Sequence, residues 1–265
     1  MNNSLEIRTT RLKYVLWPLT IVSLLLLCIP SLYVIIWSLK GTSTVGTLGE
    51  STFDWYKTIF TSYDWGKSFL YSFLLAISSS LVATTSAVLY FYFSLWYRRA
   101  YQTIGYILSI GPLFFPSIVY ALALKVTFGP LAAPEWIPLI VGHVVLLVPI
   151  QYFLIESSNE LIKIEWIFGA ATMGATHREI LWQIIYPLLK KQIFISFGVG
   201  ILFSFDEIVL ASLIIDSSNA TVPKRMWDTI NRHMDPTPAV VATIVLFISI
   251  TTIILFHLRT KRKEE

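Results

Sequence analysis

The feature that most constrains this chain is a set of long apolar blocks with almost no charge. Blocks of about 18 or more such residues can cross the hydrocarbon core of a bilayer as a helix. The sequence contains six blocks, at about residues 12–37, 69–92, 104–128, 137–155, 193–215 and 239–258. Only 14% of the residues are charged, whereas a soluble domain carries about 25%. We expect an all-α integral membrane protein with about six transmembrane helices, forming a single transmembrane domain over 1–265.

The first block admits two interpretations, a cleaved signal peptide or a membrane span. A signal peptide has an apolar core of about 7–15 residues, followed by small residues at a cleavage site. This block is longer, and residues 32–37 are Leu-Tyr-Val-Ile-Ile-Trp, which offer no such site. An uncleaved span is therefore the favoured interpretation.

Lysine and arginine residues gather at particular ends of the blocks. Most lie in the N-terminal segment, in 96–102, in 156–191 and in the C-terminal tail. With six spans these four segments fall on one side of the membrane, which the positive-inside rule identifies as cytoplasmic. The segment 216–237 goes against the rule, because it contains basic residues although six spans place it on the non-cytoplasmic side. We expect a multi-pass protein with both termini in the cytoplasm.

The sequence lacks the signatures of soluble catalytic and metal sites. Its one cysteine, Cys28, excludes an intrachain disulfide and a thiolate metal cage. Its four histidines are spread over different segments, with no His-Glu-x-x-His pair. The net charge of +4 comes from basic residues at block ends, which suits membrane lipid rather than nucleic acid as a partner. We expect no enzymatic activity, metal or cofactor in this chain.

Residues 160–187 form an amphipathic segment that follows a span on the basic side. Small residues cluster in its middle, where a partner could approach the backbone closely; they are Gly169, Ala170, Ala171, Gly174 and Ala175. An apolar stripe at helical spacing follows over 180–185, and Pro187 is placed to open the next helix. The pattern predicts either a device that docks a partner or surface helices packed on the chain itself.

The same segment resembles the cytoplasmic loop of permeases of binding-protein-dependent ABC importers. The pattern of that loop is Glu-Ala-Ala, three residues, Gly, nine residues, Ile, one residue, Leu-Pro. With Gly174 as the glycine, Ile184 and Pro187 fall at the required positions. Gly169 and Ala170 fall at the two alanines. The resemblance implies that the segment docks an ATPase through these residues: Glu165, Gly169, Ala170, Gly174, Ala175, Ile184 and Pro187.

Two positions depart from the pattern of the loop. Phe168 replaces the glutamate, and Tyr186 replaces the leucine. Glu165 lies one helical turn before the missing glutamate and is a candidate to replace it. The sequence leaves open whether it does so.

The C-terminal third resembles the second permease of the spermidine/putrescine importer type. The matching stretches are Phe-Ser-Phe-Asp-Glu at 203–207, Thr-Val-Pro-Lys-Arg-Met-Trp at 221–227, and the start of the last block after Asp235-Pro236. Leu-Tyr-Ser at 70–72 and Gly-Pro-Leu-Phe-Phe-Pro at 111–116 fit the same family, so that the likeness covers about 65–256.

The resemblance implies a type I ABC importer (MetI-like) transmembrane domain in the bacterial plasma (inner) membrane. The implied partners are a second permease subunit, two ATPase subunits and an extracytoplasmic solute-binding protein. No cofactor would bind this chain, since ATP and Mg²⁺ would be held by the ATPases. The implied function is ATP-driven import of polyamines or a related small organic cation. The chain would form half of the translocation pathway, and the binding protein would dock on the outer loops 39–66 and 216–237.

Asp206 and Glu207 are the most informative ionisable residues, because a charge at membrane depth is costly unless it faces water, a partner or substrate. One or both carboxylates could attract a cationic solute in the pathway, or they could hydrogen-bond neighbouring helices. Adjacent residues on a helix point about 100° apart, so we expect only one to face the pathway. His143, in the fourth block, is expected to be a buried hydrogen-bonding residue rather than a ligand.

Two other functions remain open from the sequence. An ion-coupled secondary transporter or channel would have broken helices with ionisable groups at the midplane, but it would have no need of an ATPase-docking segment. A closer alternative keeps the ABC architecture and imports another small solute, such as an aminophosphonate or an amino-acid derivative. The acidic pair favours a cation only weakly.

Overall fold

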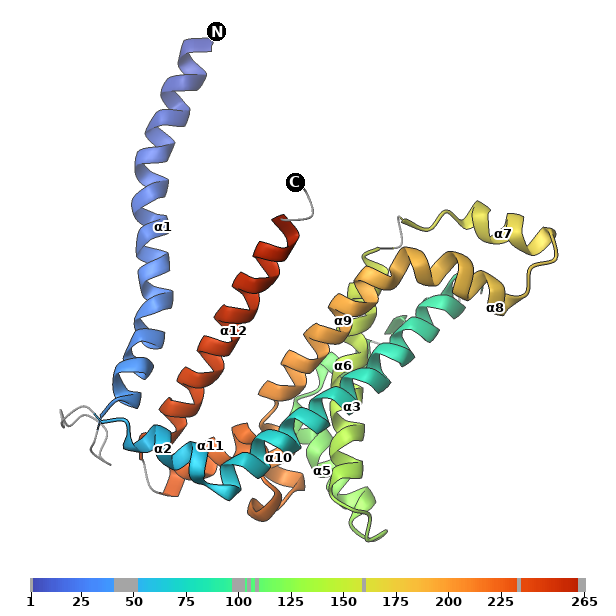
Figure 1. Ribbon diagram of the computed structural model, residues 1–265. Helices are drawn as coiled ribbons and strands as arrows, with labels where there is room; N and C mark the ends of the chain where they lie inside the picture. The colour runs from blue at the N-terminus through green and yellow to red at the C-terminus, as the bar shows by residue number, and fades with distance from the viewer. Residues whose placement is uncertain are drawn as a thin grey trace. The chain divides into compact units, whose positions relative to one another are not determined.

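The computed structural model describes residues 2–40, 52–96, 103, 106–107, 110–158, 161–232 and 235–261, with side chains described from residue 16 onward apart from 252–253 and 255–261. The regular elements in these ranges are helical, as the apolar blocks predict. The chain divides into two compact units, one made of 1–63 and 226–265 and the other of 64–225 (Figure 1).

The first unit contains two long apolar helices and one short one. They are α1 (Asn2–Ser38), α2 (Asp54–Thr61) and α12 (Thr237–Lys261), and α12 packs against both of the others. Ser38 at the end of α1 shares a hydrogen bond of 2.8 Å with Tyr56 of α2. The described side chains of α1 from Leu16 to Leu32 are exposed. Their apolar character suits contact with lipid or with another chain.

The second unit is a helical bundle that holds every candidate site residue. Its long helices are α3 (Tyr63–Ser94), α6 (Trp136–Glu156) and α9 (Tyr186–Asp206). Its shorter elements are η1 (Gly111–Phe114), α5 (Ser117–Phe128), α7 (Ile164–Thr172), α8 (His177–Glu179), η3 (Ile180–Ile185), α10 (Val209–Ile214) and η4 (Ser217–Asn219). The helix α11 (Val222–Arg232) begins in this unit and continues into the other one. Within this unit, α7 and α8 lie at one end of the bundle and α5 and α10 at the other (Figure 1).

Four helical stretches among the described residues are long and apolar enough to cross a membrane: Leu16–Ser38, Tyr63–Ser94, Trp136–Glu156 and His177–Asp206. Two further apolar helices, Ser117–Phe128 and Thr237–Thr251, are shorter over the residues described. These six match the six apolar blocks in order. The bounds predicted for the fifth span were wrong, however. Its helix begins at His177 rather than near 193, and it ends at Asp206 rather than near 215.

The continuity of the fifth span depends on a π-helical stretch. We expected Pro187 to open a new helix, but η3 passes directly into α9 and Pro187 is the second residue of α9. A proline inside an α-helix lacks one N–H donor and its ring clashes with the carbonyl four residues earlier. A π-turn widens the helix by one residue just before Pro187, which lets the chain continue without a break.

The core of the second unit contains a buried polar cluster that joins its three long helices. Gln151 of α6 donates from Nε2 to Ser80 Oγ of α3 at 2.9 Å and to the Ser196 carbonyl of α9 at 3.4 Å. Ser80 donates in turn to the Phe197 carbonyl of α9 at 2.7 Å. The side chains of Ser80, Gln151 and Ser196 are almost completely buried. Gly200 lies beside this Gln151 cluster, where a Cβ atom would come within 1.8 Å of Gln151 Nε2.

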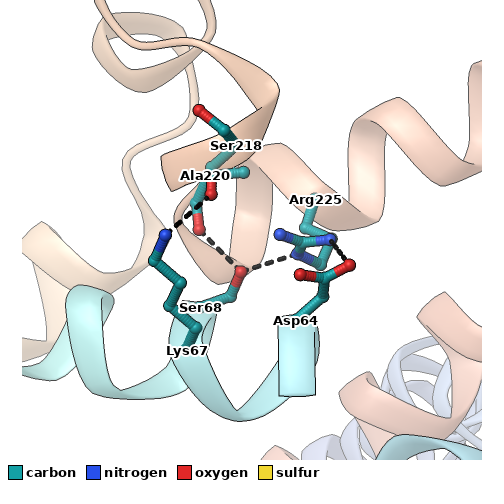
Figure 2. Close-up of polar contacts among 6 residues, drawn as sticks. All are labelled: Asp64, Lys67, Ser68, Ser218, Ala220 and Arg225. Carbon is teal, nitrogen blue, oxygen red and sulfur yellow. Dashed lines mark hydrogen bonds and ion pairs between the residues drawn. The ribbon is translucent and has the colours of Figure 1, made fainter. Parts of the chain in front are cut away.

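A second polar cluster fastens the segment before α11 to the start of α3 (Figure 2). Ser68 Oγ donates to the Ala220 carbonyl at 2.7 Å and accepts from Arg225 Nε at 2.6 Å. Lys67 Nζ donates to the Ser218 carbonyl at 3.3 Å. Asp64 lies 3.8 Å from the Arg225 guanidinium but is exposed, so this ion pair contributes little. Ser68 is therefore the central residue of this cluster.

Ser68→Ala is expected to loosen the 216–222 segment. A buried hydrogen bond to the Ala220 carbonyl and a partly buried one from Arg225 Nε would be lost, at a cost of about 1–3 kcal/mol. Amide hydrogen exchange over 216–222, measured on the purified complex in nanodiscs, should become faster. Ser78→Ala is the matched control, because the Ser78 hydroxyl bonds only to carbonyls of its own helix. Equal exchange in both variants would contradict the role given to Ser68.

Candidate functional site

The predicted docking segment folds as a helical hairpin at one end of the second unit. α7 ends at Thr172, and the chain reverses through Gly174, which has a φ of 90°. That backbone conformation is readily accessible only to glycine. Thr176 then caps the next helix in a capping box with Glu179, in which each side chain accepts from the other residue's backbone N–H. The turn and cap together explain why a helix, a turn and a second helix form here.

Apolar contacts hold the hairpin on the ends of α3 and α6. Ile167 and Ile180, one from each arm, are buried in a cluster with Phe91, Tyr152 and Ile155. The sequence left open whether the hairpin docks a partner or packs on the chain itself. The structure shows that it packs on its own chain through these residues while other residues of the same helices stay exposed.

A hydrogen bond and edge-to-face aromatic contacts fix the start of the second arm. Tyr92 of α3 shares a hydrogen bond of 2.9 Å with His177 Nδ1, and its hydroxyl also lies 3.2 Å from the His177 carbonyl. The Trp96 ring lies 4.4 Å from the His177 ring and 6.2 Å from Phe168. Phe168, which replaces the family glutamate, therefore packs on an aromatic side chain of its own bundle.

The predicted docking residues are divided between the two faces of this hairpin. Glu165 is exposed, and Gly174 lies exposed at the turn. The half-buried members are Gly169, Ala170, Ala175 and Ile184. Pro187 is exposed inside the continuous helix rather than at a helix start. The exposed apolar side chains beside them are Leu161, Trp166, Phe168 and Met173. The docking role of the seven predicted residues stays a prediction.

The second predicted site, Asp206 and Glu207, lies at a break between two helices. Asp206 is the last residue of α9, and Glu207 is extended, with φ −73° and ψ 110°. The expectation that both residues lie within one helix, about 100° apart, is therefore wrong. The Glu207 Oε1 atom accepts from the backbone N–H groups of Val209 at 2.8 Å and Leu210 at 3.1 Å. Glu207 thus caps the start of α10, whereas Asp206 is exposed.

A cavity of about 240 Å³ lies beside this break. Its walls come from η1 and α5, from α6, and from the end of α9. Its polar lining residues are Ser117, His143, Ser204 and Glu207. His143 is buried and bonds through Nδ1 to Ser204 Oγ at 2.7 Å, which confirms the expectation of a buried hydrogen-bonding histidine. Sequence reasoning missed Ser204 and the cavity, because nothing in the local pattern indicates which residues face each other across a bundle.

Lys125, at the end of α5, donates from Nζ to the Leu213 carbonyl of α10 at 2.8 Å. This bond satisfies a carbonyl in the last turn of a short helix. Within the described residues no group of three or more His, Cys, Asp or Glu side chains gathers in a way that could hold a metal ion.

With this geometry described, the comparison with known families is informative. The model of the family described as the inner membrane component of binding-protein-dependent transport systems matches residues 79–261. The chain belongs to this family. Members of this inner membrane component family are permeases of ABC importers, so the chain is a multi-pass membrane transport subunit rather than an enzyme.

Two named relatives illustrate how the family varies. The spermidine/putrescine transport system permease protein PotC of Haemophilus influenzae is 24% identical, over 80% of this chain and 82% of its own length. The galactooligosaccharides transport system permease protein GanQ of Bacillus subtilis is 25% identical, over 84% of this chain and 80% of its own length. The chain is thus similar to a PotC-type permease, as its motifs indicated.

Solved structures support the fold. The crystal structure of a bacterial ABC transporter involved in the import of the acidic polysaccharide alginate matches with a TM-score of 0.71 and 16% identity, covering 99% of both chains. A second structure of a bacterial alginate ABC transporter, in complex with a periplasmic protein bound to an alginate pentasaccharide, matches with the same TM-score and 14% identity, over 95% of both chains. The all-α, MetI-like importer fold expected from the sequence is confirmed.

Proposed function

We propose that this inner membrane component forms half of the translocation pathway of an importer for polyamines or a related small organic cation. The observation that carries this proposal is the helix break at Asp206 and Glu207, next to a cavity in the bundle. Carboxylates at membrane depth are costly and mark substrate or ion pathways. Exposed Asp206 is the candidate for the pathway, whereas Glu207 both caps α10 and lines the cavity. The PotC relative, named for spermidine and putrescine transport, supports the same cargo class.

The coupling mechanism rests on the hairpin formed by α7 and α8. Two ATPase subunits, which bind ATP and Mg²⁺, would receive this hairpin, and a second permease would complete the pathway. Because η3 makes the hairpin's second arm continuous with α9, a displacement of the hairpin would act directly on the helix that ends at Asp206. A solute-binding protein would deliver cargo to the opposite side. Both termini would lie in the cytoplasm.

A second candidate cargo is an oligosaccharide. GanQ is named for galactooligosaccharides, and the two matched crystal structures concern alginate. Sugars bring hydroxyl groups that both donate and accept hydrogen bonds, whereas the polar atoms beside the break include a carboxylate that attracts cations.

The experiment that tests the cargo is uptake into proteoliposomes that contain the chain with the second permease, ATPase and binding protein encoded beside it. Radiolabelled spermidine, putrescine and a galactooligosaccharide would be compared, with and without ATP inside. ATP-dependent uptake of the polyamines supports the proposal, whereas uptake of the sugar alone overturns the cargo. Purification of a stable homo-oligomer without an ATPase would overturn the importer mechanism and favour ion-coupled transport.

Asp206→Asn is expected to lower polyamine uptake by about tenfold or more, because the substitution removes the exposed negative charge at the break while it keeps the size of the side chain. The ATPase should still co-purify with the variant, since Asp206 is far in sequence from the hairpin. Asp216→Asn is the matched control: Asp216 is also exposed, but it lies after α10 rather than at the break between α9 and α10, and uptake by this variant should stay close to that of the wild type. Equal losses in both variants would contradict a pathway role for Asp206.

A further inference from the structure

One buried polar atom beside the helix break has no partner in the part of the chain that the structure describes. His143 is 1% exposed, its Nδ1 bonds to Ser204, and its Nε2 carries no hydrogen bond. A buried polar atom without a partner destabilises the folded state, because it has lost its hydrogen bonds to water. Leu or Met would fill the same volume on α6 without this cost, so the packing of α6 alone does not explain a histidine at this position.

The cavity lined by His143 offers mainly hydrogen-bond acceptors. Glu207 uses Oε1 to cap α10, and a carboxylate has about four acceptor positions in all. The remaining walls are apolar and include Leu113, Leu147 and Phe203. The cavity thus combines a negative charge and unused acceptors with surfaces suited to a short alkyl chain.

We infer that this cavity, lined by His143, Ser204 and Glu207, is a subsite for a terminal primary ammonium group on a short alkyl chain. The inference rests on the proposed function and specifies how the cargo would be recognised. A primary ammonium group has three N–H donors and no acceptor. One donor pairs with the Glu207 carboxylate and another with His143 Nε2, while the alkyl chain contacts the apolar walls.

The bond between His143 and Ser204 allows the tautomer that this recognition requires. Because a serine hydroxyl both donates and accepts, Ser204 Oγ can accept from Nδ1–H, which leaves a free lone pair on Nε2 of the neutral imidazole. Ser204 is a positioning residue for the His143 ring, and His143 is the residue that touches the ligand. An anionic group would be repelled by Glu207. A quaternary ammonium has no N–H and would leave Nε2 unpaired.

The test is equilibrium binding of radiolabelled putrescine to the permease–ATPase complex in nanodiscs, in the ATP-bound state and without the binding protein. His143→Leu is expected to weaken binding by about tenfold or more, since it removes an acceptor in a buried site. His143→Gln places an amide oxygen near the position of Nε2 and should restore most of the affinity. A bis-quaternary analogue with the same carbon chain should bind the wild type more weakly than putrescine and lose little affinity in His143→Leu.

Ser204→Ala separates ligand binding from structural support. Both Ser204→Ala and His143→Leu remove the hydrogen bond between α6 and α9, but only His143→Leu removes Nε2. If His143 serves structure alone, both variants lose thermal stability and bind putrescine equally; that result would overturn the subsite. The subsite predicts a clearly larger loss of binding in His143→Leu than in Ser204→Ala.

The outcomes distinguish the subsite from the cargo assignment. Wild-type binding of putrescine with no change in His143→Leu would overturn the subsite and leave a polyamine importer intact. Wild-type binding of a galactooligosaccharide and of no amine would overturn both. Putrescine binding that His143→Leu abolishes and His143→Gln restores would support both.

Discussion

Gly200→Ala is expected to destabilise the transmembrane bundle more than any other single-methyl change discussed for this chain. The added Cβ would lie 1.8 Å from Gln151 Nε2 and 2.4 Å from Ser80 Oγ, far inside van der Waals contact. Either α9 must move away from α3 and α6, or the Gln151 cluster must break. Overpacking together with unpaired buried polar groups would cost about 2–5 kcal/mol.

Thermal inactivation of the purified complex measures this effect. The temperature at which half of the Gly200→Ala complex remains monodisperse in mild detergent should fall well below that of the wild type. Gly198→Ala provides a control on the same helix, because a Cβ atom there meets no heavy atom within 4 Å. That variant should behave like the wild type. A Gly200→Ala complex as stable as Gly198→Ala would show that the three helices do not pack as closely as described.

Gly174→Val is expected to abolish transport-coupled ATP hydrolysis while the protein still inserts in the membrane. A Cβ atom at Gly174 would enter open space, so no clash in the isolated chain opposes a larger residue. The obstacle is the φ of 90°, which a β-branched residue adopts only with strain of about 1–3 kcal/mol. The chain would relieve this strain by changing the turn, which moves α7 relative to η3 and displaces the predicted docking surface.

A series of substitutions distinguishes backbone strain from simple bulk. Gly174→Asn should retain more coupled hydrolysis than Gly174→Val, because asparagine tolerates positive φ better than a β-branched residue. Gly169→Ala should be nearly neutral, since Gly169 lies in α7 with open space around its Cβ position. Substrate-stimulated ATPase activity in nanodiscs is the measurement. If the Val variant keeps full coupling, the docking role assigned to this turn is wrong.

The sequence predicted the features that depend on a residue's own chemistry. The length of each apolar block forces a helix in the membrane, since backbone polar groups have no water there to bond. The small residues around Gly174 marked the place where the chain turns between α7 and α8. These are local properties, and one sequence is enough to find them.

The course of the fifth span was beyond such reasoning. Pro187 suggested a helix start, whereas the π-turn of η3 carries the helix through. Apolar residues continue past Asp206, yet the helix stops there because Glu207 caps α10 instead of continuing α9. A capped break or a π-turn has a local free energy close to that of a regular helix. The packing of the surrounding helices therefore decides which of them forms.

The sequence by itself determined that this chain is a membrane-spanning helical protein with an importer-type loop at 160–187 and an acidic pair in its fifth apolar block. Only the tertiary structure decided which side chains meet. Ser80, Gln151 and Gly200 are separated by dozens of residues, as are His143 and Ser204. Their contacts depend on how α3, α6 and α9 are rotated about their axes, and that rotation is set by close packing of whole helix faces rather than by any local pattern.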